Sequence, residues 1–264
     1  MFELSKEKYK NSEYKLLIAK IIDKYEFAKT KNKITYTDFL NISEISVAKN
    51  VLKEEKIQNY IIYGGKEDAD RNLLLFYPEK FSKEMIEKNF EKIVEVIRIK
   101  LPNNIKYEHR EFLSGIMKLG IIREKFGDII VTDFGADIIV LSEISKVILN
   151  DLKTLTRFRK SEIAIYNIKE LTKTETEFEN INIIVSSIRL DNFVAELANC
   201  SRKNSEEIIN QGKVFINSMN EFKASKKINI NDIITIRGKG KFIFDGVEKE
   251  TKSGRYLLNM RKYK

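Results

Sequence analysis

The sequence predicts an α+β protein built from three small parts, and three observations support this fold class. Its 264 residues are enough for two or three small domains. Apolar residues recur at helical spacing in some segments and form short β-branched runs in others. Turn-forming Gly, Pro and Asn residues separate these segments. We expect an N-terminal α+β domain at residues 1–80, a βαββαβ middle domain at 81–172 and a C-terminal domain at 181–264.

Composition limits the classes of protein and the kinds of site. No apolar run approaches the roughly 18 residues that cross a bilayer, so we expect a cytoplasmic chain without a membrane partner. Cys200 and His109 are the single cysteine and histidine, which excludes an internal disulfide and a multi-Cys or His-rich metal site. The net charge is +9, and residues 181–264 hold 16 basic and 9 acidic residues, a net of +7. Abundant Lys also fits an AT-rich coding sequence, so the location of the charge is more informative than its size.

The N-terminal part begins with a helical stripe and ends with two strands. The stripe consists of Leu4, Tyr14, Leu17, Ile18, Ile21, Ile22 and Tyr25. A second amphipathic segment follows at 43–56, with Thr37 and Ser43 as predicted N-caps. Short apolar runs at 60–63 and 73–77 predict strands, and the Gly64-Gly65 pair between them predicts a turn.

The middle part alternates strands and helices in the order β-α-β-β-α-β. Strands are predicted at 93–101, 128–132, 136–141 and 163–168, and helices at 107–119 and 142–155. This order is that of a ferredoxin-like fold, which is also the RRM topology. An RNA-binding RRM sheet carries paired aromatic residues, whereas the predicted strand here offers Ile129, Ile130 and Val131. A structural or docking role is therefore favoured over base stacking, which stays open as an alternative.

A polar segment at 172–179 is predicted to link the middle domain to the C-terminal domain. Leu190, Phe193, Val194 and Leu197 then form an apolar helical stripe. Ser201 is the predicted N-cap of a second helix that ends at Gly212. Strands are predicted at 213–216, 233–237 and in the glycine-rich run 237–241.

Basic residues stand where these C-terminal elements begin. Arg189, Arg202, Lys203 and Lys213 can converge at one edge of the two-helix unit, and further cations follow at Arg237, Lys239 and Lys241. Guanidinium and ammonium groups beside helix N-termini bind phosphate. Solvated surface charge is the alternative, but the clustering at element starts favours an RNA-binding module.

An ordered set of motifs in this region resembles the S4-like RNA-binding domain. The set comprises Arg189-Leu190-Asp191, Ser201-Arg202, Gln211-Gly212-Lys213-Val214, Asn217 and Asp232-Ile233-Ile234. The resemblance implies an S4-like fold for residues 181–264. It also implies that Arg189, Ser201, Arg202 and Lys213 face RNA.

Flanking stretches extend the resemblance to the YlmH family of bacterial three-part proteins, which are encoded near cell-division genes. They are HREFLSGIMKLGIIREKFGDIIV at 109–131, Ala69-Asp70-Arg71 with the Gly64-Gly65 turn, RGKGKF at 237–242 and TKSGR at 251–255. Family members more often have Glu where Asp70 stands. The predicted RNA-binding residues are Arg189, Ser201, Arg202, Lys203, Lys213, Asn217, Arg237, Lys239, Lys241, Lys252 and Arg255.

The YlmH resemblance implies a non-enzymatic factor without a cofactor. Such a factor binds the large ribosomal subunit carrying peptidyl-tRNA and acts in rescue and quality control of stalled translation. The expected partners are ribosomal RNA and the large subunit, with tRNA as a further candidate, and a monomer suffices.

Two other functions are alternatives to this one. An S4-domain RNA-modifying enzyme of the pseudouridine-synthase type needs a catalytic Asp, but Asp191 is followed by Asn-Phe-Val and is better explained as an acid at a helix start. His109 has no identified nucleophile or orienting partner. A cell-division-linked interaction protein is the second alternative.

Overall fold

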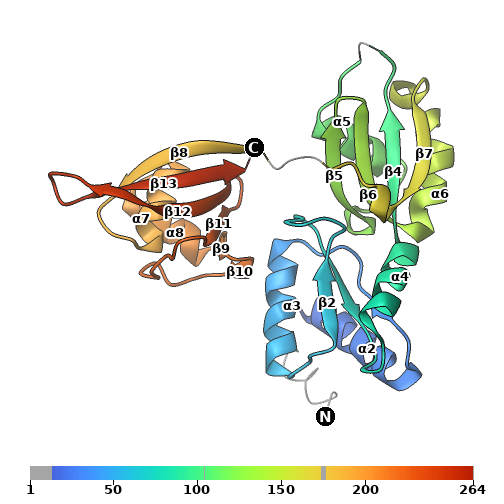
Figure 1. Ribbon diagram of the computed structural model, residues 1–264, viewed down its shortest axis with the longest axis horizontal. Helices are drawn as coiled ribbons and strands as arrows, with labels where there is room; N and C mark the ends of the chain where they lie inside the picture. The colour runs from blue at the N-terminus through green and yellow to red at the C-terminus, as the bar shows by residue number, and fades with distance from the viewer. Residues whose placement is uncertain (1–13, 104, 174–176, 264) are drawn as a thin grey trace. The chain divides into compact units, whose positions relative to one another are not determined.

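The computed structural model describes residues 14–103, 105–173 and 177–263. The chain divides into two compact units, Met1–Thr174 and Glu175–Lys264. Each unit contains both helices and sheets, which confirms the predicted α+β class (Figure 1). Within the described ranges, no helix combines the length and the apolar character needed to cross a membrane.

The N-terminal part of the first unit packs two helices on a small antiparallel sheet. The helices are α2 (Lys15–Lys31) and α3 (Ile42–Glu54), and the strands β1 (Thr35–Tyr36), β2 (Tyr60–Tyr63) and β3 (Leu73–Phe76) lie in the order β1-β3-β2. The predicted helical stripe is confirmed from Lys15 onward, while Leu4 lies outside the described residues. Its buried members Ile18, Ile21 and Ile22 form the core of this part.

The predicted caps of α3 are wrong, because Asn41 is the N-cap. The Asn41 side-chain oxygen accepts the backbone N–H groups of Ser43 (2.9 Å) and Glu44 (3.1 Å), and the Glu44 carboxylate accepts the Asn41 N–H (2.7 Å). This is a capping box. Thr37 instead accepts the Leu74 N–H at 3.0 Å through its hydroxyl, because it lies beside β3.

The middle part has the predicted ferredoxin-like topology. Its strands are β4 (Val94–Lys100), β5 (Phe126–Thr132), β6 (Gly135–Leu141) and β7 (Glu162–Asn167), and its helices are α5 (His109–Lys118) and α6 (Ser142–Asp151). The strands form one antiparallel sheet in the order β5-β6-β4-β7. Helix α4 (Lys83–Ile93), which runs directly into β4, was not predicted, although Ile86, Phe90 and Ile93 recur at helical spacing.

Both faces of this sheet are covered. On one face, Phe112 and Ile116 of α5 and Ile148 of α6 pack against strand residues such as Ile97 and Ile138. On the other face, Val96 and Ile139 pack with Phe39, Leu73 and Leu75 from the N-terminal part. The face on which an RRM stacks bases is therefore buried inside the first unit. Whether residues 1–80 and 81–172 are separate domains stays a prediction.

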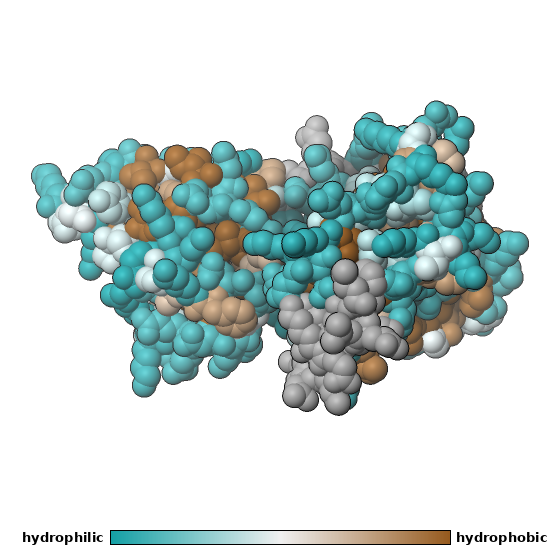
Figure 2. Space-filling view, turned by 90° about the horizontal axis from the view of Figure 1, so that it is seen from below, coloured by the Kyte–Doolittle hydropathy of each residue, from teal (hydrophilic) through white to brown (hydrophobic). Residues whose placement is uncertain are grey.

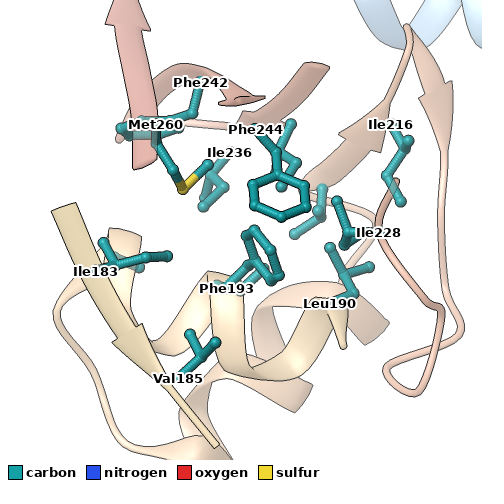
Figure 3. Close-up of a cluster of buried hydrophobic side chains, with 14 of the residues drawn as sticks. Ile183, Val185, Leu190, Phe193, Ile216, Ile228, Ile236, Phe242, Phe244 and Met260 are labelled. Carbon is teal, nitrogen blue, oxygen red and sulfur yellow. The ribbon is translucent and has the colours of Figure 1, made fainter. Parts of the chain in front are cut away.

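The second unit is a six-stranded antiparallel sheet with two helices on one face. The strands lie in the order β10-β9-β11-β12-β13-β8. Their bounds are β8 (Phe178–Val185), β9 (Val214–Ile216), β10 (Met219–Asn220), β11 (Ile233–Ile236), β12 (Gly240–Glu250) and β13 (Tyr256–Tyr263). The helices are α7 (Leu190–Ala198) and α8 (Arg202–Asn210). Figure 3 shows Phe193 of α7 against Phe244 of β12, with ring centroids 5.1 Å apart.

Two predictions at the edges of this unit are wrong. The predicted linker 172–179 extends too far, because its last two residues belong to β8, which begins at Phe178 and pairs with β13. Arg237, Gly238 and Lys239 form a turn and not a strand. The Lys239 N–H donates to the Ile236 carbonyl at 2.9 Å, and Gly238 has a φ of +76°, which a glycine adopts readily. The chain thus reverses between β11 and β12, and only Gly240 and Lys241 belong to a strand.

Candidate nucleic-acid interface

A buried carboxylate joins the starts of the two helices in the second unit. Asp191, which is 0% exposed, accepts hydrogen bonds from Arg189 Nε (3.1 Å) and Nη2 (2.8 Å). Its Oδ2 also accepts from Arg202 Nε (3.2 Å) and Nη2 (3.0 Å). The Arg189 and Arg202 side chains remain 40% and 59% exposed. One internal negative charge therefore holds two guanidinium groups at the surface.

Local structure explains why these three side chains meet. Arg189 is the N-cap residue of α7, and Asp191 lies in the first turn of that helix. The start of α7 is anchored to a loop, because the N–H groups of Leu190 and Asp191 donate to the Lys226 and Ala224 carbonyls at 2.8 and 3.0 Å. The predicted cap at Ser201 is confirmed: its hydroxyl accepts the Asn204 N–H at 3.2 Å. Arg202 is consequently the first residue of α8.

The contacts within this trio favour the charged forms of Asp191 and Arg189. Burial alone would raise the pKa of Asp191, but the hydrogen bonds from Arg189 and Arg202 lower it below its ordinary value of 3.8. The hydrogen bond to Asp191 likewise raises the pKa of Arg189. We name Arg189, Asp191 and Arg202 the arginine clamp. It carries a net charge of +1 near neutral pH and presents two planar forks that suit phosphate.

Lys213 and Arg237 form a second basic location. Lys213 follows the opposite end of α8, roughly 13 Å along the helix from Arg202. It lies beside Arg237, whose N–H donates to the Lys213 carbonyl at 2.9 Å. Both side chains are exposed, as are Lys203 in the first turn of α8 and Lys239 in the β11–β12 turn. The structure thus brings Arg189 and Arg202 together and places Lys213 with Arg237.

The remaining predicted residues lie elsewhere in the second unit. Asn217 holds a turn, because its amide donates to Asp232 (2.8 Å) and accepts the Ile233 N–H (2.9 Å). Lys252 and Arg255 are exposed at the tip of the β12–β13 hairpin. Since β12 has 11 residues, this tip is about 35 Å from the β11–β12 turn. That these residues contact RNA stays a prediction.

A cluster of cations and aromatic rings near Lys241 was missed by the sequence analysis. Lys241 Nζ lies 4.5 Å from the centroid of the Tyr263 ring, which packs edge-on against Phe178 at 4.9 Å. The Arg261 guanidinium is 4.8 Å from the Phe178 ring and forms a bidentate pair with Asp245. The alternation of Arg261 and Tyr263 on one side of the last strand was the available signal. These residues extend the basic surface with side chains that can stack on bases.

Hydrophilic side chains dominate the face of each unit shown in Figure 2, with smaller apolar patches between them. Exposure alone therefore does not identify a basic residue as part of a binding site. In the arginine clamp, by contrast, one fully buried carboxylate fixes the geometry of two exposed arginines.

The conspicuous motifs of the first unit join its two sheets. The Asp128 carboxylate accepts the N–H groups of Asp70 (3.0 Å) and Arg71 (3.1 Å), and Arg71 Nη2 donates to the Phe39 carbonyl at 2.7 Å. Burial raises the pKa of Asp128. Burial, and then the nearby Arg71, lowers the pKa of Arg123 to about 10. These contacts give the motif residues a packing role between the N-terminal and middle parts.

His109 is the first residue of α5, within the helix predicted at 107–119. Partial desolvation and then the Arg123 charge lower the pKa of His109 below its ordinary value. Among the described residues, no three or more His, Cys, Asp and Glu side chains form a group that could hold a metal ion.

Comparisons with known proteins agree with the sequence motifs. Residues 86–173 match the family model described as "Putative RNA-binding domain in YlmH". The chain is 25% identical over 231 residues to the "Ribosome-associated protein quality control protein P2" of Bacillus subtilis (strain 168), covering 86% of this chain and 87% of that protein. The predicted resemblance to the YlmH family is confirmed.

A solved structure with a YlmH name is also similar to the chain. It is "Cell division protein ylmH from Streptococcus pneumoniae", with a TM-score of 0.47 and 19% identity, over 61% of this chain and 96% of that one. The YlmH family model covers the middle part, and so the likeness of residues 181–264 to the S4-like domain stays a prediction.

Proposed function

We propose that this chain is an RNA-binding factor that associates with the large ribosomal subunit carrying peptidyl-tRNA. In this proposal it acts in rescue and quality control of stalled translation. The name of the Bacillus subtilis relative and the RNA-binding description of the family model support the proposal. The observation that carries it is the arginine clamp, in which buried Asp191 fixes two exposed guanidinium groups.

Binding would work by shape and phosphate contact. Each guanidinium has five N–H donors, and Asp191 uses only those of Nε and Nη2 in Arg189 and Arg202. The remaining donors can face phosphate oxygens. Because Asp191 holds the side chains in place before RNA arrives, less conformational entropy is lost on binding. Phosphate contacts of this kind position a protein on structured RNA without reading its sequence.

The same geometry opposes the enzymatic alternative. Asp191 is fully buried, and both of its oxygens accept hydrogen bonds from arginine. A catalytic aspartate of a pseudouridine synthase has to reach the substrate base, which this arrangement prevents. We therefore propose a non-enzymatic factor that needs no cofactor. If the chain acts on the ribosome, it works in the cytoplasm. The proposed role needs only a monomer, and tRNA is a further candidate partner.

The experiment that tests this function is co-sedimentation of the full chain with large ribosomal subunits that carry peptidyl-tRNA. The double variant Arg202→Ala, Lys213→Ala removes one cation from each basic location. We expect it to fold normally by circular dichroism and to lose co-sedimentation. A matched control is Lys83→Ala, Lys88→Ala on α4, where both lysines are exposed and paired with Glu87 and Glu84. Unchanged sedimentation of the folded double variant would overturn the proposed function.

A further inference from the structure

The middle part matches an RNA-binding family model, yet the sheet face that an RRM uses is closed. Val96, Ile130 and Ile139 on that face pack with residues of the N-terminal part. Val96 and Ile139 are 0% exposed and Ile130 is 7% exposed. RNA that contacts residues 86–173 therefore has to contact another surface of this part.

The helical side of the same sheet carries a groove of about 370 Å³ between α5 and residues 154–158. Gly115 of α5 makes this geometry possible, because a Cβ added there would lie 2.4 Å from the Phe158 ring. Phe158 is fully buried against Phe112, with ring centroids 6.0 Å apart. The wall of the groove is thus fixed by the core of the middle part.

The groove lies in a basic surface. Residues 153–160 include four basic residues and no acidic one. Lys118 and Arg157 line the groove, and Lys153, Arg159 and Lys160 flank the lining segment in sequence. All five side chains belong to exposed residues. The two glutamates near the start of α5, Glu108 and Glu111, are paired with Arg110.

Arg157 is oriented before any ligand binds. Its Nη1 donates to the Glu111 carbonyl at 3.1 Å and to Ser114 Oγ at 2.9 Å. The Tyr107 ring lies 5.9 Å from the guanidinium carbon, and the Tyr107 hydroxyl donates to the Arg157 carbonyl at 3.1 Å. Nε and Nη2 are not used by these hydrogen bonds, so their N–H groups can donate to phosphate oxygens at low entropic cost.

We propose that this groove binds the phosphate backbone of RNA, with Lys118 and Arg157 at its wall and Lys153, Arg159 and Lys160 as flanking phosphate contacts. The inference rests on the proposed RNA-binding function and adds a second contact surface, in a different unit from the arginine clamp. It also explains how a ferredoxin-like domain can bind RNA while its sheet face is buried.

The test is filter binding of the full chain to protein-free ribosomal RNA over a range of salt concentrations. The groove variant carries Lys153→Ala, Arg159→Ala and Lys160→Ala, which removes the flanking cations and leaves the hydrogen-bonded Arg157 in place. We expect its affinity to fall at least roughly tenfold and the slope of log K against log salt to decrease by about 2. The control carries Lys80→Ala, Lys83→Ala and Lys88→Ala, which removes the same charge from another exposed region.

The outcomes separate this inference from the proposed function. Weak binding by the groove variant and near-normal binding by the control support the groove. If the groove variant binds like the unaltered chain while the Arg202→Ala, Lys213→Ala variant binds weakly, the groove is overturned and the function stands. An equal loss in the groove variant and the control overturns the groove as a specific site. Unchanged binding in all variants overturns both.

Discussion

Two buried aspartates, one in each unit, are held by arginine in different ways. Asp137 in β6 accepts Arg98 Nε (2.8 Å) and Nη2 (2.7 Å) and the Thr172 N–H (2.9 Å). The Arg98 guanidinium lies 4.4 Å from the Tyr166 ring, and its side chain is only 17% exposed. Asp191 is equally buried, but its two arginines are 40% and 59% exposed.

The same type of contact, arginine with a buried aspartate, stabilises the fold in the first unit and positions exposed charge in the second. The Asp137–Arg98 pair is neutral and enclosed, and it ties the segment after β7 to the sheet. The arginine clamp has an excess positive charge and faces solvent. Bidentate arginine–carboxylate geometry therefore does not indicate a binding site by itself. What distinguishes the clamp from the enclosed pair is the number of arginines around the carboxylate and the exposure of their side chains.

The largest effect is expected when the enclosed pair is broken. Asp137→Ala leaves Arg98 largely buried without its carboxylate, and we expect the free energy of unfolding of the first unit to fall by about 3–5 kcal/mol. Urea denaturation followed by circular dichroism measures this, since the chain has no Trp. A loss below about 1 kcal/mol would show that Arg98 finds water instead and would remove the contrast with the clamp.

Breaking the arginine clamp is expected to lower the free energy of unfolding by less. Asp191→Ala leaves Arg189 and Arg202 partly hydrated, so we expect the second unit to lose about 1–3 kcal/mol. Hydrogen exchange measured separately for α7 and for β4 distinguishes the two units. A loss as large as that of Asp137→Ala would mean that the clamp is mainly structural.

Acid is expected to weaken both the Asp137–Arg98 pair and the arginine clamp. Burial raises the pKa of Asp137, but hydrogen bonds from Arg98 and Thr172 outweigh it and hold the pKa below 3.8. A lowered folded-state pKa contributes stability that is present above the ordinary pKa and lost as pH falls through the lowered value. Thermal unfolding from about pH 5 to about pH 2 measures this loss. Asp137→Asn should flatten the pH dependence of the first unit, and an unchanged slope would exclude Asp137 as its source.

The smallest effect is expected from Arg202→Lys, which keeps the charge and loses the planar fork. Loss of about one net hydrogen bond, ~1 kcal/mol, weakens RNA binding roughly fivefold. Filter binding at one salt concentration measures it, with Lys203→Arg as a charge-neutral control one residue away. Equal affinity of Arg202→Lys and the unaltered chain would mean that charge alone matters at this position.

Local signals made part of this structure predictable. The Ser201 cap, the βαββαβ order and the basic residues at helix starts depend on neighbouring residues, and the sequence indicates them directly. Two missed elements also had local signals, the Asn41–Glu44 spacing of a capping box and the apolar alternation of β8. The Asn41 cap was missed because Asn41 lies before the apolar stripe of the helix that it caps. Strand β8 was missed although Ile181, Ile183 and Val185 alternate, because its partner β13 is distant in sequence.

The shared contact of both arginines with buried Asp191, and the closed sheet face, could not be predicted in this way. Asp191 and Arg202 are separated by eleven positions and meet only because α7 and α8 pack together. The cover on the middle sheet comes from Phe39, Leu73 and Leu75, which precede that sheet in sequence. Such contacts depend on tertiary packing, which periodicity does not encode.

In the proposed function, Asp191 orients two arginines toward RNA. The most direct test is the affinity of Asp191→Asn for large ribosomal subunits, measured beside the unaltered chain at the same salt concentration. The variant gains one unit of positive charge, so attraction by charge alone would strengthen binding. We predict weaker binding, because Asn cannot hold two guanidinium groups with charge-assisted hydrogen bonds. Equal or tighter binding would contradict the claim.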